Sequence, residues 1–259
     1  MIKDSWQYLE RDKEGELLRK AASKGIVHVA RYYHETVRVR NIEDDVCNNV
    51  RKGPDITKAI DFWQSRSLVS LSTTITLLSA LADCISGHES LRQRAGLLHR
   101  DISIGNLLIG EDNRGFLIDL DLAVKEQRLG ASGSKGKTGT RAFMAVGALL
   151  CERHSFTHDL ESFFWVLFWI CIHCDGPGRG RVVDRLDRWN YADIEELAKL
   201  KLGTVSDEDI FRITMEESCY SSVATVSIAL EGCKQVRHHS GIRAVGGTPR
   251  PTITIYRSR

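Results

Sequence analysis

A polar loop lies between two short apolar segments in "GLLHRDISIGNLLI", residues 96–109. Its side chains include the carboxylate of Asp101 and the carboxamide of Asn106. Both residue types are common in turns, so a simple turn is one interpretation. The other interpretation is chemistry on a phosphate, with Asp101 as a base or orienting group and Asn106 as a magnesium ligand. The loop alone leaves both open, and the rest of the chain decides between them.

A second acidic motif, "LIDLDLA", follows the loop at the end of an apolar segment. The apolar stretches "NLLIG" and "GFLIDL" are separated by "EDNR", and this pattern predicts a β-hairpin. Such a hairpin would bring Asn106 beside Asp119, two oxygen ligands of the kind that Mg²⁺ prefers. Asp121 adds another carboxylate beside this pair. The spacing therefore predicts a metal site suited to phosphoryl transfer, with Asp101 free to orient an attacking hydroxyl.

Periodicity predicts the elements around this site. Apolar residues spaced for one helical face predict helices over residues 5–23 and 73–91, and β-branched and aromatic residues after Gly25 predict strands. The most apolar run, residues 163–174, is much shorter than the roughly 20 residues that span a bilayer. Its apolar residues surround the helix on all sides, so we expect a central buried helix.

Composition limits the classes of protein that need to be considered. The chain has 259 residues, of which 42% are hydrophobic and 27% charged, enough for a substantial core. The net charge of +2 provides no overall field for nucleic acid or a membrane surface, and we expect neither as a partner. The seven cysteines have no framework spacing, which predicts reduced thiols and an intracellular location, cytoplasmic or nuclear.

Four motifs in the expected order resemble the protein-kinase fold. "HRDISIGN" is similar to the kinase catalytic loop, and "DLD" at residues 119–121 stands where kinases carry D-F-G. "GTRAFMA", from Gly139, resembles the end of the activation loop, and "HDLESFFWVLFW" resembles the helix beneath the catalytic loop. The sequences of these motifs are similar to those of the fungal-type protein kinase family, and the resemblance covers roughly residues 1–200.

The resemblance implies an α+β, two-lobed protein-kinase-like fold. It implies a partial N-terminal β lobe over residues 1–60 and a mainly helical C-terminal lobe over 61–232. The basic composition after Glu231, which includes no acidic residue, predicts a flexible tail over 233–259. ATP and Mg²⁺ are the implied cofactors. The implied reaction is transfer of the γ-phosphoryl group to a serine or threonine hydroxyl of a protein substrate.

The resemblance also implies roles for individual residues. Asp101 is then the catalytic base, within the motif formed with His99 and Arg100, and Asn106 and Asp119 hold the metal. Arg100 suits pairing with a phosphorylated activation loop, for which Ser132, Ser134 and Thr138 are available. We expect Thr140 to hydrogen-bond Asp101, and Asp159 to hydrogen-bond the backbone of the catalytic loop.

The implied nucleotide contacts lie near the start of the chain. "IKDSW" resembles the strand that carries the phosphate-binding lysine, which makes Lys3 the candidate. Its partner acid is expected on the first helix. Glu14 is preferred to Glu16 because Leu18 would then pack under His99 and Leu120.

Several kinase features differ here, and they keep other functions open. No Gly-rich loop precedes Lys3, so we expect a truncated N-terminal lobe and weakened activity. Ser103 replaces the catalytic-loop lysine, Asp121 replaces the glycine of D-F-G, and residues 146–148 lack the glutamate of A-P-E. A pseudokinase or scaffold without catalysis is one alternative. A small-molecule phosphotransferase of the aminoglycoside or choline kinase type is another, although Arg100 argues against it.

Overall fold

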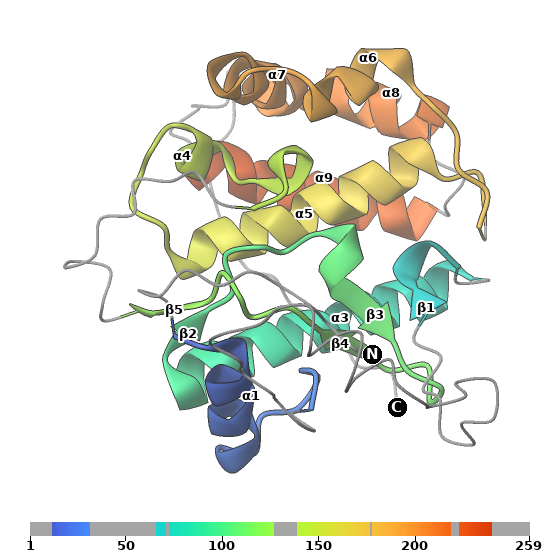
Figure 1. Cartoon of the computed structure of the whole chain (residues 1–259). Coiled ribbons are helices and arrows are strands. Elements are labelled where there is room, and N and C mark those ends of the chain that lie inside the picture. The colour runs from blue at the N-terminus through green and yellow to red at the C-terminus, as the bar shows by residue number, and fades with distance from the viewer. Residues whose placement is uncertain are drawn as a thin grey trace, which may run out of the picture.

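The computed structural model describes residues 12–31, 66–70, 73–126, 139–176, 178–218 and 223–239. Within these ranges, the α-helices surround two small sheets (Figure 1). The helices are α1 (Glu14–Ser23), α3 (Thr74–Ser90), α4 (Val146–Leu149), α5 (Phe156–His173), α6 (Asp184–Asp187), α7 (Ile194–Ser206), α8 (Glu208–Ser218) and α9 (Val223–His239). The strands are β1 (Arg66–Ser67), β2 (Leu97–Leu98), β3 (Leu107–Ile109), β4 (Gly115–Leu117) and β5 (Val124–Lys125).

Short helical turns connect these elements. The 3₁₀ turns are η3 (Leu68–Ser70), η5 (Ile104–Asn106), η7 (Arg141–Phe143) and η8 (Arg188–Asn190). A π-helical turn, η4 (Leu91–Ala95), follows α3 directly and ends at Gly96, which has a left-handed φ of 64°. This left-handed residue ends the helix and directs the chain into β2.

Helix α5 is the central element of the core, as Figure 1 shows. Its side chains are buried on all sides, and Trp165, Val166 and Phe168 have no exposed surface. Ser155 begins the helix through a capping box with His158. The expected buried helix over residues 163–174 is confirmed, and it starts earlier, at Phe156. No helix of the described ranges is long and apolar enough to cross a membrane.

The predicted hairpin is confirmed. Strands β3 and β4 pair antiparallel with Leu108 opposite Phe116, and β1 joins the free edge of β3. Helix α3, which is capped by the Thr73 side chain, packs against β4. A side chain at Gly115 would drive its Cβ into the backbone oxygen of Ala80, so glycine is required at this contact.

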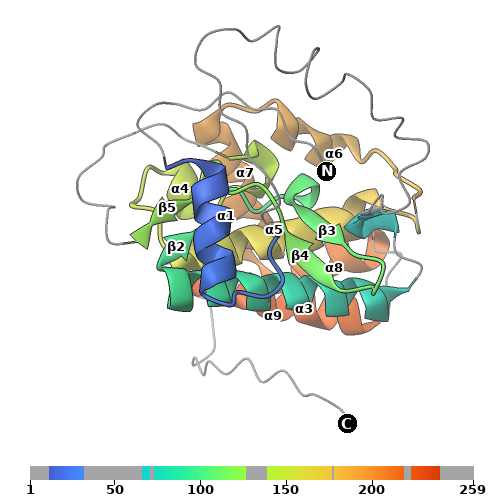
Figure 2. The same cartoon turned by 60° about the horizontal axis from the view of Figure 1, so that its bottom comes forward.

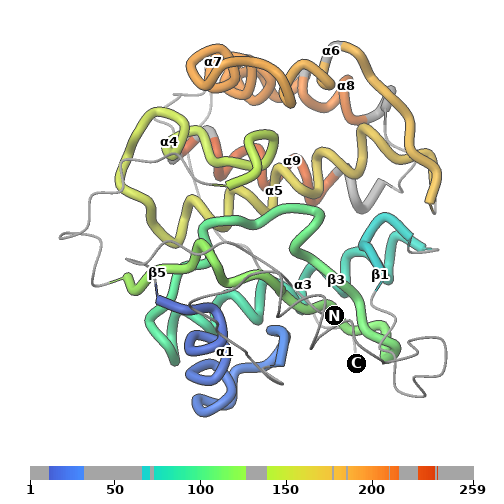
Figure 3. The backbone as a smooth tube through the Cα atoms, in the orientation of Figure 1, coloured from blue at the N-terminus to red at the C-terminus, as the bar shows by residue number. Residues whose placement is uncertain are grey.

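The second sheet holds the two polar segments close to each other. Strands β2 and β5 pair antiparallel, with Leu98 opposite Val124. The loop that resembles the kinase catalytic loop, residues 99–106, is called the catalytic-type loop; it leaves β2 and enters β3. The acidic motif, with Asp119 and Asp121, lies between β4 and β5. Both polar segments are therefore anchored at their two ends by paired strands. The backbone in Figure 3 can be followed from α1 through this region to α5 and α7.

Helix α1 packs beside the turn that precedes β2 (Figure 2). Lys20 donates a 2.6 Å hydrogen bond to the backbone oxygen of Ala95, and Lys125 of β5 lies 3.2 Å from Asp12. The predicted helix over residues 5–23 is seen from Glu14, and residues 1–11 lie outside the described part.

Two expectations differ from the structure. The segment after Gly25 forms an isolated parallel bridge between Val29 and Leu117, and residues 32–65 lie outside the described part. The boundary of the expected flexible tail at residue 233 is wrong, because α9 continues to His239 with Cys233 and Val236 buried. The segment was expected to be flexible because it is basic, but its buried residues Cys233 and Val236 are three positions apart, which places them on one face of a helix.

Candidate active site

His99 anchors the beginning of the catalytic-type loop. Its side chain has no exposed surface, and its Nε2–H donates to the backbone oxygen of Ile118 at 3.0 Å. Its Nδ1 accepts the backbone N–H of Asp101 at 3.3 Å. Burial lowers the pKa of His99, which is consistent with a neutral ring that donates at one nitrogen and accepts at the other. The ring therefore connects the loop to the strand that leads to Asp119.

Asp101 is held from two sides. The side-chain amide of Asn106 donates to the backbone oxygen of Asp101 at 2.9 Å and to its Oδ2 at 3.0 Å. Thr140 donates its backbone N–H and its Oγ–H to Oδ1, at 2.9 and 3.2 Å. The expected hydrogen bond between Thr140 and Asp101 is thus confirmed. Gly139 has a φ of +118° and passes close to the loop, where a Cβ would lie only 3.1 Å from the backbone oxygen of Arg100.

The buried carboxylate of Asp159 supports the loop from below. Its Oδ2 accepts the backbone N–H of His99 at 3.0 Å, and its Oδ1 accepts that of Arg100 at 3.1 Å. Arg100 has a left-handed φ of 68°, an unfavourable conformation for a side chain of this type. The two hydrogen bonds stabilise this bend, so the expected contact between Asp159 and the loop backbone is confirmed.

Two histidines complete the surroundings of Asp159. His88 of α3 donates to Oδ2, and His154, just before α5, donates to Oδ1, both at 2.7 Å. Burial raises the pKa of Asp159, but the hydrogen bonds from His154 and His88 outweigh burial and hold its pKa well below the ordinary value. The sequence predicted a role for neither histidine. Neither lies in a recognisable motif.

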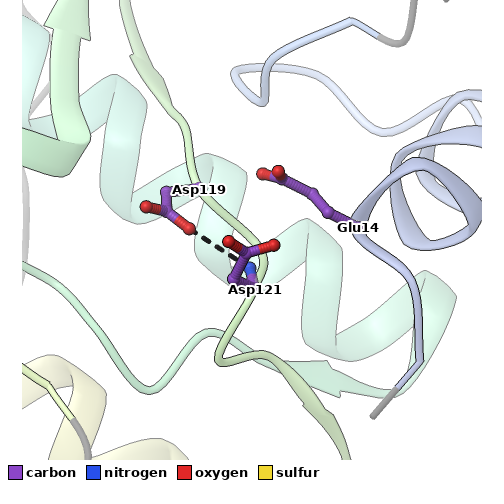
Figure 4. A group of neighbouring side chains, drawn as sticks. All are labelled: Glu14, Asp119 and Asp121. Atoms are coloured by element: carbon purple, nitrogen blue, oxygen red, sulfur yellow. Dashed lines mark hydrogen bonds between the residues drawn. The ribbon is translucent and has the colours of Figure 1, made fainter. Parts of the chain in front are cut away.

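Three carboxylates gather on the other side of the loop, at the acidic motif (Figure 4). One oxygen from each of Glu14, Asp119 and Asp121 lies within 4.8 Å of the others. Glu14 accepts the backbone N–H of Leu120 at 2.8 Å, and Asp119 accepts that of Asp121 at 3.2 Å. Clustered carboxylate oxygens are suitable ligands for a hard divalent cation.

The hairpin brings Asn106 next to this cluster through the backbone. The N–H of Ile118 donates to the backbone oxygen of Asn106 at 3.0 Å. Because the Asn106 amide nitrogen is used on Asp101, the side-chain oxygen is the atom that could serve a metal.

The two candidates for the acid on the first helix lie in different surroundings. Glu14 is half-buried at the acidic motif, whereas Glu16 is exposed. Lys3, its expected partner, lies outside the described residues. The spatial grouping of Glu14 with Asp119 and Asp121 was not expected, since the sequence predicted Glu14 only as the partner of a lysine.

A small pocket opens beside Asp101. Its wall is formed by the catalytic-type loop on one side and by the segment that leads into α4 on the other. The lining residues are Arg100, Asp101, Ile102, Gly139, Thr140, Met144, Ala145, Ala148, His154 and Ser162. Asp101 and Thr140, which share a hydrogen bond, both line this pocket.

Comparison with known protein families gives a match that spans the candidate site. The model of the fungal protein kinase family matches residues 1–74 and 64–171. These matches include α1, the catalytic-type loop, the acidic motif and most of α5. A search of curated proteins gives no significant match.

Proposed function

Because this chain belongs to the fungal protein kinase family, we propose that it transfers the γ-phosphoryl group of ATP to a serine or threonine hydroxyl of a protein. The observation that carries the proposal is the restrained carboxylate of Asp101, which Asn106 and Thr140 hold beside a pocket. A fixed carboxylate next to an acceptor site is what positioning catalysis requires.

Asp101 is the proposed proton acceptor. An acceptor hydroxyl in the pocket would donate a hydrogen bond to the Asp101 carboxylate, which would take the proton as the γ-phosphoryl group passes from ADP, the leaving group, to the hydroxyl oxygen. Asn106 and Thr140 keep the carboxylate from rotating away, and Asp159 fixes the backbone on which Asp101 sits. These residues thus contribute orientation rather than covalent chemistry.

Mg²⁺ and ATP are the proposed cofactors. The donor set fits a hard cation, because the carboxylates of Glu14, Asp119 and Asp121 gather within a few ångströms at the acidic motif. Asp119 would hold the metal together with the side-chain oxygen of Asn106. When bound, the metal and nucleotide supply the phosphoryl group and neutralise its charge. Lys3 is the proposed contact to the phosphates, within a two-lobed arrangement in which residues 1–60 belong to the smaller lobe.

The acceptor class is tested by offering several acceptors in parallel. The chain is incubated with Mg²⁺ and γ-labelled ATP together with serine/threonine peptides, tyrosine peptides, an aminoglycoside or choline. We expect label on the serine/threonine peptides. The Asp119→Asn variant should lose this label, whereas Glu111→Gln, at an exposed position of the same hairpin, should retain it.

The other outcomes correspond to the alternative functions. Label on the aminoglycoside or choline would indicate a small-molecule phosphotransferase. Label on none of the acceptors, by a chain that is folded by circular dichroism, would contradict catalysis and support a scaffold.

A further inference from the structure

A buried lysine lies beneath the segment that leads into α4. Lys201 of α7 has no exposed surface, and its Nζ donates a 2.6 Å hydrogen bond to the backbone oxygen of Met144. The same nitrogen lies 4.4 Å from the ring centroid of Trp165 and 5.3 Å from that of Trp189. Burial of an amine is costly unless it is paired and hydrogen-bonded, so these contacts are a specific arrangement.

A buried carboxylate accompanies this lysine. Glu161 of α5 is 9% exposed, and its Oε1 accepts the backbone N–H of Val146 at 2.8 Å and the indole N–H of Trp165 at 2.9 Å. Burial lowers the pKa of Lys201, and the negative charge of Glu161 opposes that shift. The two residues therefore form one buried unit around Trp165, because Glu161 accepts its indole N–H and the Lys201 nitrogen lies over its ring.

The two backbone groups that this unit holds lie on either side of Ala145. Met144 and Ala145 line the pocket beside Asp101, as does Ala148. At its other end, the same segment contacts Asp101 through Thr140. The wall of the pocket is thus fixed to the catalytic-type loop at one end and to Glu161 and Lys201 at the other.

We propose that Glu161 and Lys201 are positioning residues for the acceptor substrate, because they fix the backbone of residues 144–146 at the pocket. This inference rests on the proposed function. Residues 146–148 contain no acidic side chain of their own, and the buried carboxylate that holds this segment comes from α5 instead. The described hydrogen bonds of Glu161 and Lys201 hold the backbone of residues 144–146, at the pocket wall, whereas Glu14, Asp119 and Asp121 form the acidic motif. We therefore expect their replacement to affect acceptor binding more than nucleotide binding.

The test separates acceptor binding from nucleotide binding. In Lys201→Met we expect the KM for a peptide acceptor to rise by about tenfold or more, with the KM for Mg·ATP changed by less than about twofold. Lys201→Arg, which keeps the charge, should restore part of the loss. Lys199→Met is the matched control, because Lys199 is exposed on the same helix and pairs only with Glu195 among the ion pairs described.

Hydrogen exchange tests the same arrangement without relying on catalysis. The backbone amides of residues 144–150 should exchange about tenfold faster in Lys201→Met, because removal of one partner leaves the other buried and uncompensated. The amides of His99 and Arg100, which Asp159 holds, should be unaffected. If the unmodified chain transfers no phosphate, the proposed function fails. Hydrogen exchange then still shows whether Glu161 and Lys201 fix the backbone of residues 144–146.

A double variant keeps the proposal testable if Lys201→Met alone fails to fold. Neutral side chains at both positions leave no buried charge uncompensated, so Glu161→Gln combined with Lys201→Met should fold and still show the raised peptide KM. Unchanged exchange at residues 144–150, or equal acceleration of exchange throughout the core, would overturn the proposal. A parallel rise in the KM values for peptide and Mg·ATP would also overturn it.

Discussion

The side-chain amide of Asn106 donates to both the backbone oxygen and the carboxylate of Asp101, at 2.9 and 3.0 Å. One side chain thereby fixes the conformation of the loop and the rotation of the carboxylate. The same residue directly precedes β3, and β3 pairs with β4, the strand that leads to Asp119. The proposed base and the proposed metal site are therefore connected through a single residue.

Replacement of Asn106 should affect both functions. In Asn106→Ala, the Asp101 carboxylate loses one restraint and the metal loses one proposed oxygen ligand. We expect kcat for peptide phosphorylation to fall by about 100-fold, as is common when an orienting group is removed. Steady-state kinetics would measure this, with Asn190→Ala, an exposed position, as the control. A kcat within about threefold of the unmodified chain would contradict the role.

Thr140 allows a finer test of how Asp101 is held. Thr140→Val removes the Oγ–H donor but keeps the backbone N–H that contacts the same oxygen. The loss of one hydrogen bond of about 1 kcal/mol should reduce kcat by roughly fivefold. Thr140→Ser keeps the hydroxyl and should restore the rate. If serine and valine variants have equal rates, the hydroxyl does not contribute.

The acidic motif predicts a graded response to Mg²⁺. Asp119→Asn should raise the Mg²⁺ concentration needed for half-maximal ATP binding by about tenfold or more, since it removes a charged ligand. Glu14→Gln keeps an acceptor for the Leu120 N–H and should have a smaller effect. Calorimetric titration at several Mg²⁺ concentrations would measure both. An Asp119→Asn curve that coincides with that of Glu111→Gln would rule out Asp119 as a ligand.

Asp159 should make the free energy of unfolding depend on pH in the acidic range. Its pKa is held below the ordinary value in the folded chain, so the stabilisation is complete above the unfolded pKa of about 3.9 and is lost as pH falls below it. Asp159→Asn should lower the free energy of unfolding by about 3 kcal/mol at pH 7. The NH₂ group of the new side chain would face the N–H groups of His88 and His154, which also donate.

Urea unfolding at several pH values would measure this loss. The stability curves of the unmodified chain and of Asp159→Asn should converge as the pH falls below about 4, since only the former loses the stabilisation. Asp184→Asn, at an exposed position of α6, is the control. Curves that remain parallel down to low pH would contradict the account of Asp159.

Elements defined by local pattern could be predicted from the sequence. The hairpin followed from two apolar stretches around a polar turn, and α5 followed from an apolar run too long for a strand and too short for a membrane. The contacts of Asp159 and Thr140 with the catalytic-type loop were implied by the resemblance of these motifs to those of protein kinases.

Contacts between distant segments could not be predicted in this way. Glu14 contacts Leu120 across 106 residues, and His88 contacts Asp159 across 71. Lys201 reaches Met144 across 57 residues and looks like an ordinary helical lysine in the sequence. Only packing of the helices determines which polar side chains become buried partners. The continuation of α9 to His239 was missed because a basic composition outweighed a short apolar spacing.

The central claim is that Asp101 accepts the proton of the acceptor hydroxyl. The most direct measurement is the single-turnover rate of phosphoryl transfer from saturating Mg·ATP to a serine/threonine peptide, in the unmodified chain and in Asp101→Asn. The variant keeps the shape of the side chain, so Mg·ATP affinity should change by less than about threefold while the rate falls by about 100-fold or more. Equal single-turnover rates in the two proteins would contradict the claim.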